Sequence, residues 1–176
     1  MRAHREKDKI VLSLNPAEGQ ALEQLLKTII ANYRIRPGDL DEKARLAWYS
    51  TRGCESAGLT AEETKDWLEQ LHGYKSANVQ RLEEWCQQIS TQSPEGCKLR
   101  IEIEDAPVFL MSVNDHRLAA AARQEIGQTE MDLRSVEGLV HLKPEQQVAL
   151  FEIELLGWLM EVVLRLLDDP DAAPPA

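Results

Sequence analysis

The stretch from Pro144 to Leu167 constrains the fold of this chain more than any other. Its apolar residues follow the period of a helix, roughly 3.6 residues per turn, and cover about two thirds of its circumference. These residues are Val148, Phe151, Ile153, Leu155, Leu156, Trp158, Leu159, Met160, Val162, Val163, Leu166 and Leu167. A helix this apolar needs neighbours on several sides. We therefore expect other helices to gather around it and bury it.

Two short segments have the composition of strands. Lys9–Leu14 is a β-branched run, and Lys98–Glu104 alternates apolar and polar residues. Each is followed closely by a helix that begins with a proline, Pro16 or Pro107. The two strands are expected to pair, antiparallel, in a small two-stranded sheet. Met1–Lys9, in which basic and acidic residues alternate, is interpreted as a solvated arm.

Capping and apolar periodicity predict the remaining helices. Asn15 and Glu18 form a capping box, as do Thr60 and Glu63. We expect a loop over 53–58, another over 127–142, and helices from Pro16 to about Arg36, Asp41 to Tyr49, Thr60 to Ile89 and Asp105 to Ile126. Trp48 and Tyr49 are more apolar than a connector needs, so they are expected to cover the core or to form a dimer contact.

These elements predict an α+β fold, mostly helical, in which a helix bundle surrounds a buried C-terminal helix and carries a small two-stranded sheet. Residues 1–169 are expected to form a single domain, and 170–176 a disordered tail. A chain of 176 residues is long enough to bury a sizeable core.

The charge and cysteine content exclude several classes of partner and compartment. A net charge of −10 and a pI near 4.9 argue against binding to nucleic acid or to an anionic membrane. Acidic residues and Arg165 interrupt the most apolar helix, and the first residues lack the apolar region of a signal peptide. Cys54, Cys86 and Cys97 are an odd number without metal-ligand spacing. We expect a reduced, cytoplasmic protein.

Motifs for catalysis are absent from the sequence. It contains no G-x-S-x-G, no glycine-rich phosphate loop, no H-E-x-x-H and no Cys-x-x-Cys. His72 and His116 have no companions at metal-ligand spacing, so neither a metal nor another cofactor is expected. Cys86 and Cys97 flank a turn and are interpreted as inert thiols, with a redox cross-link as the alternative.

Four polar residues fall on helix faces that are otherwise apolar: Lys75, Asn78, Arg117 and Glu152. Buried charges need partners, because desolvation costs several kcal/mol per ion. We expect Arg117 to pair with Glu152, with Lys75 or Asn78 within hydrogen-bonding reach. The cluster would then fix the register of the helices. Alternatively, the remaining cation would bind a ligand, and these four residues are the candidate ligand-binding site.

Three short motifs resemble a known family. They are Leu71–Asn78, Val113–Ala119 and Leu156–Leu159, which occur in the order found in the bacterial domain of unknown function numbered two thousand and seventeen. The family is small, helical and common in actinobacteria. The resemblance covers roughly Lys9 to Leu167 and implies a helical protein with no assigned enzymatic activity.

The function expected from these observations is non-enzymatic. The chain is interpreted as an interaction or regulatory module that acts through protein–protein contacts, with a protein partner or as a homodimer. The alternative is a sensor of a small anion or carboxylate, with a polar pocket between helices formed by Lys75, Asn78, Arg117 and Glu152.

Overall fold

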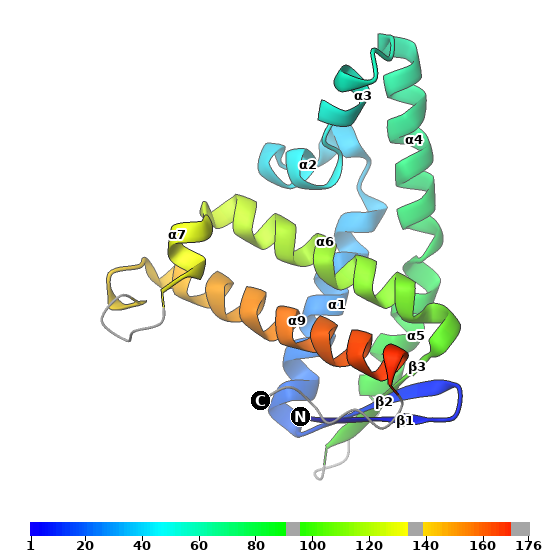
Figure 1. The fold of residues 1–176 in the computed structure, drawn as a ribbon, viewed down its shortest axis with the longest axis vertical. Helices are drawn as coiled ribbons and strands as arrows, with labels where there is room; N and C mark the ends of the chain where they lie inside the picture. Colours follow the sequence, from blue (N-terminus) through cyan, green and yellow to red (C-terminus); the bar gives the residue numbers. More distant parts are fainter. Residues whose placement is uncertain (91–95, 134–138, 170–176) are drawn as a thin grey trace.

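A small antiparallel sheet closes one end of a group of helices (Figure 1). The computed structural model describes residues 1–90, 96–133 and 139–169. Over these residues the chain is a mostly helical α+β protein, as expected. The predicted tail, 170–176, and part of the predicted loop, 134–138, lie outside the described residues.

The sheet contains the predicted pair of strands. β2 (Lys9–Leu14) and β3 (Cys97–Glu102) are antiparallel, with Ile10 opposite Ile101 and Leu12 opposite Leu99. All four of these side chains are fully buried. In β3 these residues alternate with the exposed Lys98 and Arg100, whereas in β2 Val11, between Ile10 and Leu12, is buried as well.

The expectation of a solvated arm at the N-terminus is wrong. Arg2–Glu6 forms a third strand, β1, on the free edge of β2, and the sheet order is β1-β2-β3. Lys7, in the turn between the two strands, has a left-handed φ of 54°. β1 pairs with β2 through backbone hydrogen bonds, and none of its side chains is fully buried. Its polar composition therefore gives no indication of a strand.

The helices begin near the predicted capping signals, but their boundaries differ in three places. Residues 52–56 and 128–131 are helical where loops are expected, and Asn78 divides the predicted long helix. The helical elements are α1 (Pro16–Arg34), η1 (Pro37–Asp39), α2 (Glu42–Trp48), α3 (Arg52–Ser56), α4 (Ala61–Ala77), α5 (Val79–Ser90), η2 (Ile103–Asp105), α6 (Ala106–Gln124), α7 (Gln128–Met131) and α9 (Pro144–Asp168).

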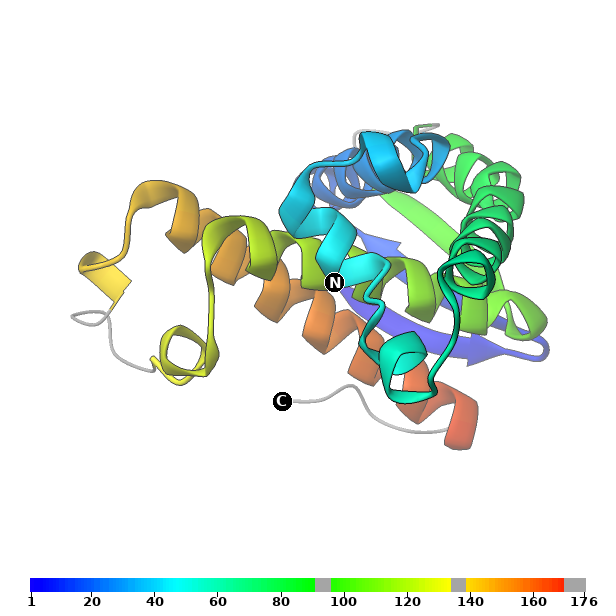
Figure 2. The same ribbon diagram turned by 90° about the horizontal axis from the view of Figure 1, so that it is seen from above.

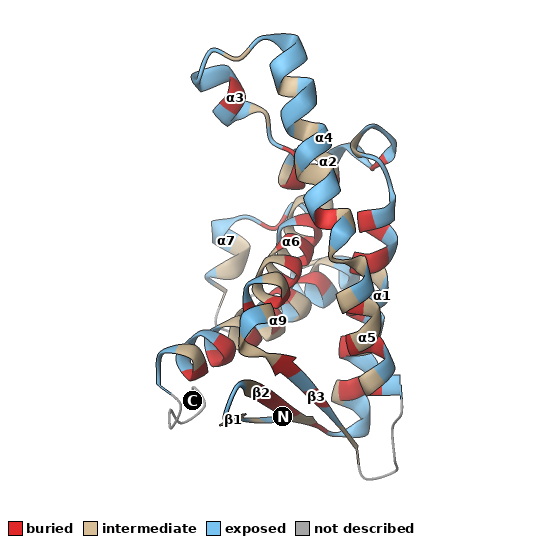
Figure 3. Cartoon of the chain, turned by 90° about the vertical axis from the view of Figure 1, so that its right-hand side faces the viewer, coloured by how far each residue is buried: buried red, intermediate tan, exposed pale blue. Residues whose placement is uncertain are grey.

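The core lies where α1, α5, α6 and α9 meet the sheet (Figure 3). Trp85 and Phe109 pack edge to face there, with ring centroids 5.4 Å apart. Trp48 and Tyr49 are also buried in this core. This confirms the first of the two roles expected for them, and it leaves neither side chain free for a dimer contact.

The C-terminal helix is less enclosed than its sequence predicts. α9 packs along α6, and Ile153, Leu156 and Val163 are buried. Its N-terminal half, together with α7 and the C-terminal half of α6, extends beyond the other helices (Figure 2), and there Val148 and Phe151 are 59% and 67% exposed. Burial on several sides is therefore wrong for this half of the helix. No helix within the described residues is long and apolar enough to cross a membrane.

Candidate functional site

The four polar residues singled out in the sequence do not form one cluster. Lys75 is buried at the end of α4, whereas Asn78 caps that helix and donates a hydrogen bond to the carbonyl of Tyr74 (3.1 Å). Arg117 and Glu152 lie at the contact between α6 and α9. Only Lys75 is fully buried.

The predicted ion pair between Arg117 and Glu152 is wrong. The Nε of Arg117 donates to the carbonyl oxygen of Ile153 at 3.1 Å, and its guanidinium lies against Gly157. A Cβ at position 157 would stand 3.1 Å from Nη2, so the missing side chain makes room for Arg117. Glu152 instead lies with Oε2 3.5 Å from Nε2 of His116, and about a third of its side chain is exposed.

The partner of Lys75 is Asp115, a residue the sequence analysis did not assign to the site. The Lys75 ammonium donates to Asp115 Oδ2, and both residues are buried. The same oxygen accepts a hydrogen bond of 2.6 Å from the hydroxyl of Tyr33. The indole N–H of Trp48 donates to the backbone carbonyl of Asp115. This one residue therefore connects α1, α2, α4 and α6.

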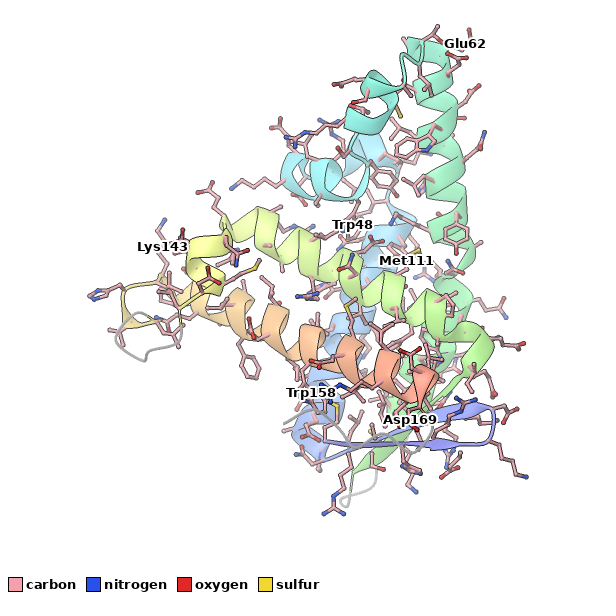
Figure 4. The ribbon with its side chains drawn as sticks, viewed as in Figure 1. Trp48, Glu62, Met111, Lys143, Trp158 and Asp169 are labelled. Atoms are coloured by element: carbon pink, nitrogen blue, oxygen red, sulfur yellow. The ribbon has the colours of Figure 1, made fainter. Side chains whose placement is uncertain are left out.

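Three aromatic rings surround the ammonium and complete what we call the Lys75 box: Lys75, Asp115, Tyr33, Trp48 and Tyr49. The ring centroids of Tyr33, Trp48 and Tyr49 lie 5.5, 5.8 and 5.9 Å from Nζ. At these distances the negative faces of the rings attract the cation. Tyr33 and Trp48 also meet edge to face, with centroids 5.6 Å apart (Figure 4 labels Trp48).

The hydroxyls of the Lys75 box keep their protons. Burial raises the pKa of Tyr33 above its ordinary value, and the neighbouring charge of Asp115 raises it further. Burial and the charge of Asp115 also raise the pKa of Tyr49 to about 12. Tyr33 is therefore a stable hydrogen-bond donor to Asp115 at neutral pH.

The sequence carried a signal for Asp115 that was not used. Ser112, Asp115 and Ala119 follow one another at helical spacing, and all three are buried on α6. Arg117 was instead expected on the buried face of this helix. Asp115 thus supplies the anion that Lys75 requires, and a carboxylate ligand is not needed to neutralise it.

Two of the concave regions outside the box bear on function. One, of about 740 Å³, lies between η1 and α4 and is lined by charged and apolar residues including Arg36, Lys65 and His72. The other, of about 270 Å³, lies between α7 and α9 and is mostly apolar. Its lining includes Met131, Leu133, Leu139, Leu150 and Phe151. We call this second region the α9 pocket.

Possible metal ligands and thiols are the other residues considered within the described part of the chain. No group of three His, Cys, Asp or Glu side chains there is arranged to hold a metal. Burial raises the pKa of the Cys86 thiol to about 11 and also raises that of Cys97. Both thiols therefore stay protonated, in agreement with the inert interpretation.

Comparison with known proteins gives one match. The family model described as "Domain of unknown function (DUF2017)" matches residues 1–167. No curated protein and no solved structure matches the chain.

Proposed function

Because the chain belongs to the DUF2017 family of domains of unknown function, we propose its role from its own surface: a non-enzymatic module that acts through protein–protein contacts. The contact surface is the apolar stripe of α9, which we define as Val148, Phe151, Leu155 and Trp158. These residues follow one another at intervals of three or four and so share one face of the helix.

The observation that carries this proposal is the exposure of Phe151. Its side chain is 67% exposed although it borders the α9 pocket, and Val148, one turn earlier, is 59% exposed. Leu155 and Trp158 continue the stripe as half-buried residues toward the centre of the molecule. A contiguous apolar surface of this kind marks a protein contact more often than an isolated exposed leucine does.

Charge determines the kind of partner. Glu154 lines the α9 pocket, Glu145 is exposed in the first turn of α9, and the chain carries a net charge of −10. A second copy would bring like charges together, which opposes a homodimer through this face. The partner that fits is an amphipathic helix with apolar anchors for the stripe and basic residues for its rim.

The alternative role, a sensor of a small anion or carboxylate, loses its main support. It depended on a cation left without a partner, and Asp115 neutralises Lys75. Arg117 is satisfied by the carbonyl of Ile153 and lies 3.7 Å from the sulfur of Met160.

A designed helical peptide of leucine and lysine tests the proposal. Isothermal titration should show binding to the wild type, and Phe151→Glu should weaken it by on the order of tenfold or more, since it removes a central apolar anchor. Leu164→Asp is the matched control, because Leu164 is 49% exposed on α9 but lies on another face. Hydrogen exchange should slow in residues 144–160 when the peptide binds.

Equal affinity of the peptide for the wild type and Phe151→Glu would overturn the proposed surface. The same holds if the two variants weaken binding equally, because the loss would then not depend on which face of α9 carries the substitution. The wild type could also sediment as a dimer that Phe151→Glu converts to a monomer. In that case the partner of this surface would be a second copy of the chain and not a basic helix.

A further inference from the structure

Helix α4 is attached to the rest of the molecule at one end. All 17 of its residues are described, and Lys75 is the only one that is buried. Leu68 and Leu71 are half-buried against the core, whereas Trp67 and Tyr74 are 38% and 55% exposed. Figures 1 and 3 show the helix rising away from the sheet and from α6 and α9, with only α3 beside its far end and most of its surface exposed.

The polar contacts that α4 makes to the other elements occur in its last turns. Besides the ion pair of Lys75, Ser76 Oγ donates to the carbonyl of Tyr33 at 3.1 Å. His72 Nδ1 lies 3.4 Å from the hydroxyl of Tyr49. Near the start of α4 the side-chain hydrogen bonds are local ones, such as those between Thr60 and Glu63.

The rest of the Lys75 box belongs to other elements and is held together without Lys75. Tyr33 is on α1, Trp48 and Tyr49 are at the end of α2, and Asp115 is on α6. Tyr33 and Trp48 each donate a hydrogen bond to Asp115, and their rings pack on one another. These four residues form a receptor for an ammonium group: one carboxylate and three aromatic faces.

We infer that Lys75 is a latch: α4 inserts it as an internal ligand into an ammonium receptor formed by α1, α2 and α6, and α4 opens as a separate unit when the latch is released. Asn78, the one residue between α4 and α5, is where the chain can pivot. The vacated receptor then takes a primary alkylammonium group of the size of the lysine side chain.

Native-state hydrogen exchange of the wild type tests the separate opening. Amides of 61–77 should exchange through an opening that is at least about tenfold more populated than the one that exposes α1, α5 and α6. Exchange of all four helices at one common rate would overturn the latch, because α4 would then unfold only with the whole molecule.

Chemical rescue tests the receptor. Lys75→Ala should speed exchange in α4 by on the order of a hundredfold, which is the scale expected when a buried pair is broken. n-Propylammonium chloride should restore protection, whereas n-propanol, which has the same chain without the charge, should not. Lys65→Ala is the matched control, because it removes an exposed lysine from the same helix. Rescue by both compounds, or by neither, would overturn the ammonium receptor.

A second variant covers the case in which Lys75→Ala does not fold. Lys75→Met with Asp115→Asn removes both charges and leaves the box occupied by a neutral chain. This variant lacks the contacts of the ammonium with the three rings and with Asp115, so the latch predicts faster exchange in α4 and unchanged protection in α1 and α6. Wild-type protection of α4 in this variant would show that packing, and not the ammonium, holds the helix.

Discussion

The ammonium of Lys75 donates a hydrogen bond to the carboxylate of Asp115 in a place where the two residues are only 3% and 7% exposed. Two ions in such a site lose their hydration, and the hydrogen bonds and ring contacts of Lys75 and Asp115 offset that cost. Removing one partner is a different matter, because it leaves an uncompensated charge in the core. The pair therefore specifies how α4 and α6 meet.

Asp115→Ala should destabilise the protein by about 3–5 kcal/mol, because it leaves the Lys75 cation buried and alone. Urea unfolding followed by circular dichroism measures this change. Glu152→Gln is the matched carboxylate variant and should cost less than about 1 kcal/mol, since Glu152 is partly exposed and faces only His116. Equal losses in the two variants would contradict the assignment of Asp115 as the essential anion.

Gly157→Ala should stabilise the protein less than Gly73→Ala does. Both glycines lie inside helices, where alanine is favoured by about 1 kcal/mol. Nothing lies within 4 Å of a Cβ at position 73, so that variant should gain the full amount. At position 157 the new methyl would press on Nη2 of Arg117 and disturb its bond to Ile153. Thermal unfolding of the two variants gives the comparison, and an equal gain would show that Arg117 moves aside freely.

The protein should lose stability in alkali through its buried tyrosines. The pKa of Tyr49 is raised by burial to about 12, whereas an unfolded tyrosine has a pKa of about 10. The folded state keeps a proton that the unfolded chain releases. The stability from this hydroxyl is therefore fully present below about pH 10 and is lost as the pH rises from 10 to 12. Burial shifts the pKa of Tyr33 in the same direction.

Urea unfolding at several pH values in this range measures the loss. Tyr49→Phe should show a shallower decline above about pH 10, and Tyr74→Phe, which alters an exposed ring, is the matched control. A decline of the same slope in Tyr49→Phe and the wild type would show that its hydroxyl is not responsible.

Cys86 should react slowly with alkylating reagents. Burial raises the pKa of its thiol from the ordinary value of 9.0 to about 11, so its thiolate fraction near neutral pH is about a hundredfold lower than in the unfolded chain. Mass spectrometry of peptides after timed labelling with iodoacetamide compares the folded and urea-unfolded protein. Rapid labelling of Cys86, or a Cys86–Cys97 disulfide under mild oxidant, would restore the redox interpretation.

Local sequence patterns predicted the strands that have a buried face of their own. The β-branched run of Lys9–Leu14 was enough to identify β2, and the alternation of Leu99 and Ile101 with polar residues was enough to identify β3. β1 was missed because an edge strand is defined by pairing of its backbone with β2, which its polar side chains do not report.

The predicted contacts of the site were wrong for a related reason. Helical spacing placed Lys75 correctly on a buried face, but it says nothing about how two helices rotate relative to one another. That rotation brings Asp115 to Lys75 and directs Arg117 past Gly157 to a backbone carbonyl. The exposure of Phe151 was likewise hidden, because an apolar residue looks the same in sequence whether its own chain or another molecule covers it.

The apolar stripe of α9 should make self-association depend on salt. At low ionic strength the net charge of −10 keeps copies apart, and sedimentation equilibrium should show a monomer. Raising the salt to about 1 M shortens the Debye length from about 10 Å at 0.1 M to about 3 Å. Repulsion between copies then weakens while the apolar attraction remains, so association should appear.

Phe151→Glu should abolish this association, and Leu164→Asp, on another face of the same helix, should not. A wild type that stays monomeric in high salt would show that the stripe is too small to hold a second copy. A dimer already present at low salt would show that acidic repulsion does not govern this surface.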